Sequence, residues 1–146
     1  EDQQHLICIA LKSLSVNDSI CKIVSHYGAL EIAMKSLQKN VKNVKVSSEI
    51  CKLIKILARN DQNKVKLNEI GCTALLLSII HEFKKPNEAF IICQAMQALS
   101  VITLRQPDIC SNIVNLNGIE IVFVKLKQII PTLAMMLVML YYAICT

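Results

Sequence analysis

Four basic residues, Lys12, Lys52, Lys55 and Arg59, have the clearest potential to bind a ligand in this sequence. The last three are spaced i, i+3 and i+7, so on a helix they would share one face. Between positions 35 and 66 there are nine basic residues against two acidic ones. Such a face attracts acidic ligands and donates charge-assisted hydrogen bonds to carboxylates. The alternative is a solvated face that keeps an apolar protein in solution.

Motifs for catalysis, metal binding or cofactor binding are not found in the sequence. The three histidines share no metal-ligand spacing with one another or with a pair of cysteines. Phosphate-binding loops and nucleophile elbows need clustered glycines, whereas the three glycines stand at positions 28, 71 and 118. The glutamates are scattered and form no pair suited to acid–base work. We therefore predict a protein that is not an enzyme, with no metal and no cofactor.

The composition predicts one folded domain or a piece of one. Of 146 residues, 53% are apolar and 18% charged, with three Gly and three Pro, which excludes disordered and collagen-like chains. The stretch 5–14 is already helix-patterned and lacks the features of a signal peptide, so we expect a fragment of a longer chain. The seven cysteines have apolar neighbours and no C-x-x-C spacing, which predicts buried free thiols in a reducing cytosol or nucleus. They are Cys8, Cys21, Cys51, Cys72, Cys93, Cys110 and Cys145.

Three residue types recur at fixed offsets along the chain. The glycines are 43 and 47 residues apart, a leucine lies fourteen residues before each, and an aspartate lies ten before each. These positions are Leu14, Leu57 and Leu104, then Asp18, Asp61 and Asp108, then Gly28, Gly71 and Gly118. The aligned apolar positions include Val24, Leu67 and Val114. A repeat of this length is typical of solenoid proteins built from stacked helices.

Each repeat is predicted to contain a short helix, a sharp turn at the glycine, a second helix and a long helix that ends at the leucine. The aspartate would be the N-cap or lie in the first turn of the short helix. The glycine would supply a positive φ or a close backbone approach at the corner. In the middle long helix, Ile50, Leu53, Ile54 and Leu57 form the stripe of one buried face. The polar stretches 38–43 and 81–89 are expected to be loops, and 89–104 a helix packed on both sides.

The stretches 55–71 and 99–118, with 11–28 as a weaker third copy, resemble armadillo repeats. The resemblance covers positions 1–130 by pattern. It implies an all-α, right-handed solenoid that is not catalytic and whose groove, formed by the third helices, binds proteins or extended peptides. The division would be a partial repeat at 1–16, repeats at 17–60 and 61–106, and a repeat at 107–146 that is truncated or ends in an apolar helix.

On this interpretation the groove residues are Lys12, Lys52, Lys55 and Arg59. Lys12 takes the position equivalent to Lys55 one repeat earlier, so these two lysines would stack as a short cationic ladder for an acidic, extended partner. Armadillo proteins such as the importins carry a ladder of asparagines on the third helix, with tryptophan nearby. Here the equivalent positions are Ser13, Ile56 and either Val101 or Thr103, and the chain has no tryptophan. The nuclear-signal-binding role of the importins is therefore not transferable.

Two alternative functions stay open. The basic patch could bind nucleic acid, although 14 of the 16 basic residues are lysine and the patch has no aromatic residue for base stacking. The stretch 128–146 carries no charge, so it is either a buried or truncated repeat helix or the membrane anchor of an adaptor. If that helix were left uncovered, it would drive self-association.

Overall fold

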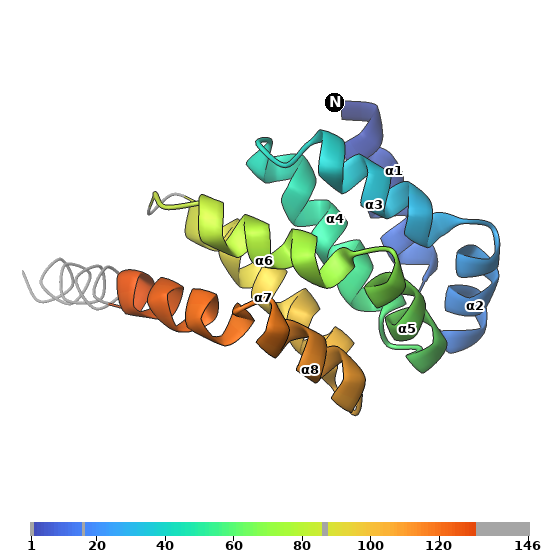
Figure 1. Ribbon diagram of the computed structural model, residues 1–146. Helices are drawn as coiled ribbons and strands as arrows, with labels where there is room; N and C mark the ends of the chain where they lie inside the picture. The colour runs from blue at the N-terminus through green and yellow to red at the C-terminus, as the bar shows by residue number, and fades with distance from the viewer. Residues whose placement is uncertain (1, 16, 86–87, 131–146) are drawn as a thin grey trace, which may run out of the picture.

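The chain is all helical within residues 2–15, 17–85 and 88–130, which are the parts described by the computed structural model (Figure 1). No strand occurs in these three ranges. The labelled helices are α1 (Asp2–Leu14), α2 (Asp18–His26), α3 (Ala29–Lys39), α4 (Val44–Leu57), α5 (Asp61–Glu69), α6 (Cys72–Glu82), α7 (Ala89–Thr103) and α8 (Pro107–Asn115). One more helix, Gly118–Ile130, follows α8. The prediction of an all-α protein is confirmed.

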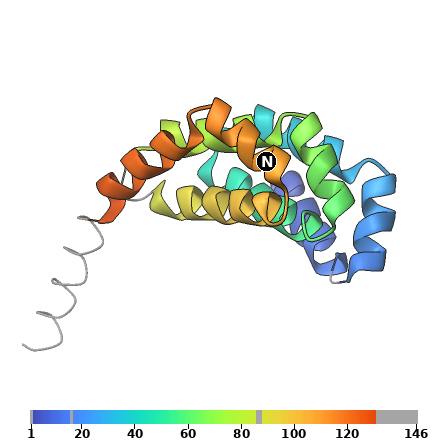
Figure 2. The same ribbon diagram turned by 60° about the horizontal axis from the view of Figure 1, so that its bottom comes forward.

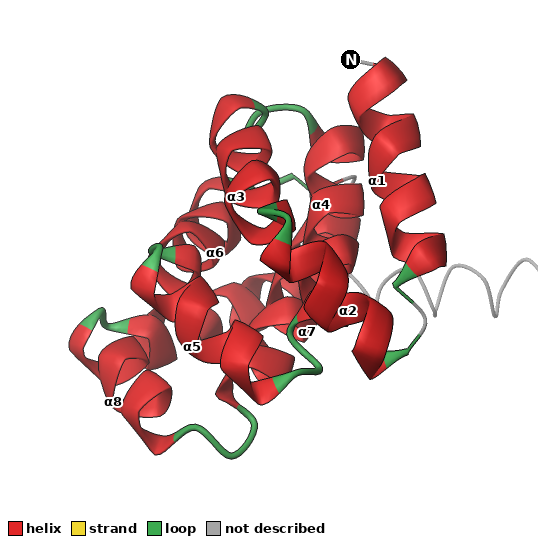
Figure 3. Cartoon of the chain, turned by 90° about the vertical axis from the view of Figure 1, so that its right-hand side faces the viewer, coloured by secondary structure: helices red, strands yellow, loops and turns green. Residues whose placement is uncertain are grey.

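The longer helices α1, α4 and α7 follow one another in space, with α4 packed between α1 and α7. The intermediate helices pack on them in the same order, α3 on α4 and α6 on α7. Seen from the side, the short helices α2, α5 and α8 form a row towards the viewer (Figure 3). The second view shows α7 (yellow) beneath the helix Gly118–Ile130 (orange) (Figure 2). In each of these rows, the successive helices are separated by similar numbers of residues along the chain.

The apolar stripe of α4 forms the centre of the core, as expected. Ile50, Leu53, Ile54 and Leu57 are all buried. Burial of one such side chain stabilises the fold by about 1.5–3 kcal/mol. The helix α7 packs against both α4 and α6, and it keeps an exposed edge that includes Phe90.

The short helices α2 and α5 are capped by asparagines rather than by the aspartates, and the N-cap residue of α8, Gln106, makes no side-chain capping hydrogen bond. The side chain of Asn17 accepts a hydrogen bond from the backbone of Ile20, and that of Asn60 accepts from the amides of Gln62 and Asn63. Asp18, Asp61 and Asp108 lie in the first turn, where their charge favours the positive end of the helix dipole. Of the two predicted roles, the first-turn role is thus confirmed and the N-cap role is wrong.

The glycine corners are alike in two cases and different in the third. Gly28 and Gly71 have φ values of 83° and 82°, in the left-handed region that glycine adopts without strain. At the third corner Asn117 takes the positive φ, 54°, and Gly118 is the first residue of the next helix. A Cβ on Gly118 would lie 2.5 Å from Ile113 Cγ2, so this glycine permits close packing instead of a left-handed turn. The prediction that all three glycines have equivalent settings is wrong for Gly118.

The third corner differs because the helices and the repeated Leu, Asp and Gly residues do not have the same spacing. From the second unit to the third, the helix starts are closer together in sequence than these marker residues are. The helices α2, α5 and α8 begin at Asp18, Asp61 and Pro107, so their starts are 43 and 46 residues apart. In the last unit each marker therefore lies one position too late. Burial agrees with this shift, because Ile113 is buried like Leu67 whereas Val114 is exposed.

Candidate functional site on the α1, α4 and α7 face

The four predicted binding residues come from two helices and one turn. Lys12 belongs to α1, and Lys52 and Lys55 belong to α4. Arg59 lies beyond the end of α4 at Leu57 and is exposed. The helix face predicted from the i, i+3, i+7 spacing therefore stops at Lys55, and Arg59 extends the same basic segment from the following turn.

Lys12 and Lys52 contact the same carboxylate, that of Glu49. The ammonium nitrogen Nζ of Lys12 lies 3.0 Å from Oε2 of Glu49, and Lys52 donates to the other oxygen, Oε1. Because Glu49 belongs to α4, the first of these contacts joins two neighbouring helices. The ladder of Lys12 and Lys55 stays a prediction, since each of these lysines has a different partner, Glu49 and Gln97.

The surroundings of Glu49 stabilise the ionised form of its carboxylate. Burial disfavours its charged form, but the hydrogen bonds from Lys52 and Lys12 outweigh this cost and hold the pKa of Glu49 below its ordinary value. The site therefore keeps a fixed negative charge between two positive ones at neutral pH. The single carboxylate orients both lysines but cancels only one of their two positive charges.

A second set of contacts connects α4 to α7. The ammonium group of Lys52 lies over the ring of Phe90, 4.8 Å from its centroid, a cation–π geometry. Lys55 donates to Oε1 of Gln97 at 2.8 Å. The three lysines thus bridge successive long helices, and they do so from one surface of the protein. Three lysines and one glutamate leave a net charge of +2 on this surface.

Sequence reasoning missed the residues that complete this surface. Glu49 is three residues before Lys52, a spacing that does predict a contact on a helix. Phe90 and Gln97 are about forty residues from their lysines, and no local signal connects them.

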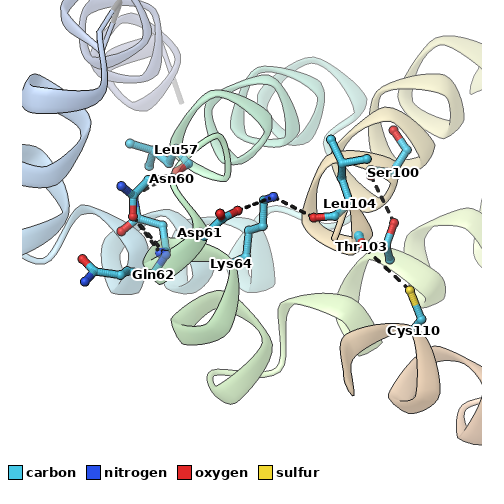
Figure 4. Close-up of polar contacts among 10 residues, drawn as sticks. Leu57, Asn60, Asp61, Gln62, Lys64, Ser100, Thr103, Leu104 and Cys110 are labelled. Carbon is cyan, nitrogen blue, oxygen red and sulfur yellow. Dashed lines mark hydrogen bonds and ion pairs between the residues drawn. The ribbon is translucent and has the colours of Figure 1, made fainter. Parts of the chain in front are cut away.

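The basic patch at 35–66 is less cationic than its composition suggests. Lys64 is buried, pairs with Asp61 at 2.7 Å and donates to the backbone oxygen of Leu104 at 2.8 Å (Figure 4). Lys66 pairs with Glu31 at 2.7 Å. Lys64 therefore connects the short helix α5 to the end of α7, and its role is structural.

The cysteines differ in their exposure. Cys8, Cys21, Cys51 and Cys72 are buried free thiols, as predicted, whereas Cys93 and Cys110 are free but exposed. Burial of all seven cysteines was thus the wrong expectation, and Cys145 lies outside the described residues. Among the described side chains, no cluster of three or more His, Cys, Asp or Glu could hold a metal ion.

The membrane question concerns mostly residues that the structure does not describe, since 131–146 lie outside it. Within the described ranges, no single helix has the length and apolarity needed to cross a bilayer. Among the described helices, α8 and Gly118–Ile130 reach that length and composition only when taken together, and the two are bent by 74°.

Comparison of the chain with protein-family models, with curated proteins and with solved structures finds no match. The resemblance to armadillo repeats therefore stays a prediction.

Proposed function

We propose that the chain is a non-catalytic protein-interaction module built as a right-handed, armadillo-like solenoid. The order and length of the helices support this proposal. Helices of 9, 11 and 14 residues (α2, α3, α4) are followed by helices of 9, 11 and 15 residues (α5, α6, α7). The repeats would run over 17–60 and 61–106, with a third helix at 1–16 and a further repeat at 107–146.

The proposed ligand is an acidic, extended segment of a partner protein, bound across α1, α4 and α7. The observation that carries this proposal is the surplus of positive charge around one ionised glutamate, with Lys12, Lys52 and Lys55 held by contacts on one surface. Carboxylates of a ligand would gain charge-assisted hydrogen bonds from lysines whose side chains are already ordered. The lysines would lose little further conformational freedom on binding, because Glu49, Phe90 and Gln97 position them.

The test measures binding of a fluorescein-labelled poly-glutamate peptide by fluorescence anisotropy at several salt concentrations. Reversal of three charges in the variant K52E/K55E/R59E should weaken binding by at least about tenfold, since each lost contact to a charged group contributes roughly 1.5 kcal/mol or more. The affinity of the unmodified chain should fall with added salt, because its long-range part is screened.

A matched variant, K35E/K39E/K42E, makes the same change of net charge at exposed lysines of α3 and the loop after it. Its affinity for the peptide should stay within about twofold of the unmodified chain, apart from the general effect of net charge. Equal losses in the two variants would show that only net charge matters, and would refute the proposed site. Far-UV circular dichroism is used to check that both variants remain folded.

A random-sequence oligonucleotide separates this function from the nucleic-acid alternative. Non-specific attraction of lysines to phosphates falls steeply with salt, so we expect little oligonucleotide binding at about 200 mM salt. Tighter binding of the oligonucleotide than of the peptide under that condition would favour a basic, nucleic-acid-associated solenoid.

A further inference from the structure

An apolar groove of about 340 Å³ lies where α7, α8 and the helix Gly118–Ile130 meet. Its apolar lining comes from all three helices: Met96, Leu99, Ile113, Ile119, Val122 and Phe123. Ile119 and Phe123 are 54% and 61% exposed, so the groove presents apolar surface that no described residue covers.

The preceding unit shows what covers such a groove. The residues 46 positions earlier in the sequence, one helix-to-helix step back, are the equivalents of these six groove residues. They are Ile50, Leu53, Leu67, Thr73, Leu76 and Leu77, and each is at most 2% exposed. Helix α7 packs against α4, α5 and α6, the helices that carry these residues. The groove formed by α7, α8 and Gly118–Ile130 is thus equivalent to the surface of α4, α5 and α6 against which α7 packs. In the groove, no described helix takes the place that α7 has there.

The chain continues past this groove with sixteen residues, 131–146, that carry no charge and are mostly apolar. The same step of 46 residues carries the start of α7, Ala89, to position 135. Pro131 has no amide hydrogen for a helix continuing from Ile130, and proline is tolerated at the start of a new one.

We propose that residues 135–146 dock into this groove of the same molecule as the next long helix. The inference depends on the three-helix repeat proposed above, but not on the acidic ligand, which is tested separately. Its consequence is that the uncharged segment belongs to the protein core and serves neither as a membrane anchor nor as a contact between copies of the chain.

Tryptophan fluorescence tests the docking in the full chain, which has no tryptophan of its own. In the variant F123W, the indole should emit at short wavelength and resist quenching by acrylamide, because the docked segment covers it. Adding L137D/L140D places two charges in the segment and should expose the indole, with a several-fold rise in quenching. In F90W, whose position lies on the exposed edge of α7, the same two substitutions should leave quenching unchanged.

The variant I23D/I32D adds two charges at exposed apolar positions of α2 and α3 and is the matched control. Combined with F123W, it should leave the indole protected. Exposure of the indole in the F123W variant itself, or equal exposure in the control, would overturn the proposal.

Hydrogen exchange of the unsubstituted chain gives a second measurement that needs no variant. Amides of 135–146 should exchange slowly, as those of α7 do, and at a rate independent of protein concentration. Exchange at the rate of an unstructured peptide would overturn the proposal. So would protection that disappears on dilution, which indicates a second copy, or protection that requires phosphatidylcholine vesicles, which indicates a membrane.

Discussion

Replacing Glu49 by glutamine tests the polar bridge between α1 and α4 directly, because the change removes a charge and keeps the size. The side chain of Glu49 is 11% exposed, and those of Lys12 and Lys52 are 29% and 26% exposed. Exposed ion pairs contribute at most about 1 kcal/mol, whereas loss of one partner from a buried pair costs about 3–5 kcal/mol. Since this pair of contacts lies between those limits, we expect E49Q to lose about 1–3 kcal/mol in free energy of unfolding at pH 7.

The loss should depend on pH in a defined direction. The pKa of Glu49 is lower in the folded protein than the ordinary value. Its stabilising contribution is therefore complete above the pKa of an unfolded glutamate, about 4.3, and disappears as the pH falls through the lower folded value. The difference in stability between the unmodified chain and E49Q should be constant near neutral pH and shrink below about pH 4.

Urea unfolding followed by far-UV circular dichroism measures both effects, at pH 7 and at several acidic values. The matched control is E69Q, the same chemical change at an exposed glutamate of α5, which should alter stability by less than about 0.5 kcal/mol. If E49Q is no less stable than E69Q, or if its deficit persists undiminished at low pH, then the lysines do not stabilise the ionised carboxylate as argued.

Two further predictions concern the third corner and the thiols. G118A should lower the free energy of unfolding by about 1–3 kcal/mol through overpacking against Ile113, whereas N117G should stay within about 0.5 kcal/mol because glycine suits the positive φ there. Urea unfolding measures both, and similar stabilities of the two variants would contradict the described corner. Burial raises the pKa of the Cys51 thiol to about 12, so an alkylating reagent at pH 8 should modify Cys51 only after unfolding and the exposed Cys93 in the native state. Peptide mapping by mass spectrometry reads out the modified positions, and fast native labelling of Cys51 would be inconsistent with its burial.

The helices and their order could be predicted because their signals are local. The apolar stripe of α4, the acidic first turns and the left-handed glycines at 28 and 71 all depend on residues within one or two helical turns of one another. The asparagine caps were not predicted, although Asn17 and Asn60 each directly precede a first-turn aspartate and asparagine is a favoured N-cap residue.

The third corner could not be placed correctly from spacing alone. The marker residues Leu104, Asp108 and Gly118 keep their mutual offsets, so the sequence is consistent with a step of 47 residues. Packing instead buries Ile113 and puts the positive φ on Asn117. Asparagine tolerates the left-handed region, so Asn117 can adopt the positive φ of this corner. Gly118 is then required for a different reason, because a side chain there would clash with Ile113.

The sequence by itself determined that this chain forms amphipathic helices in a repeating order, and that basic residues gather between positions 35 and 66. Only the tertiary structure decided which lysines face solvent and which groups they contact. Glu49 accepts hydrogen bonds from Lys12 and Lys52, and Gln97 accepts one from Lys55. Lys64 of α5 is buried against the end of α7. The physical reason is distance along the chain. Helix formation depends on residues up to four positions apart, whereas a long, flexible lysine finds its partner on whichever helix packs beside it.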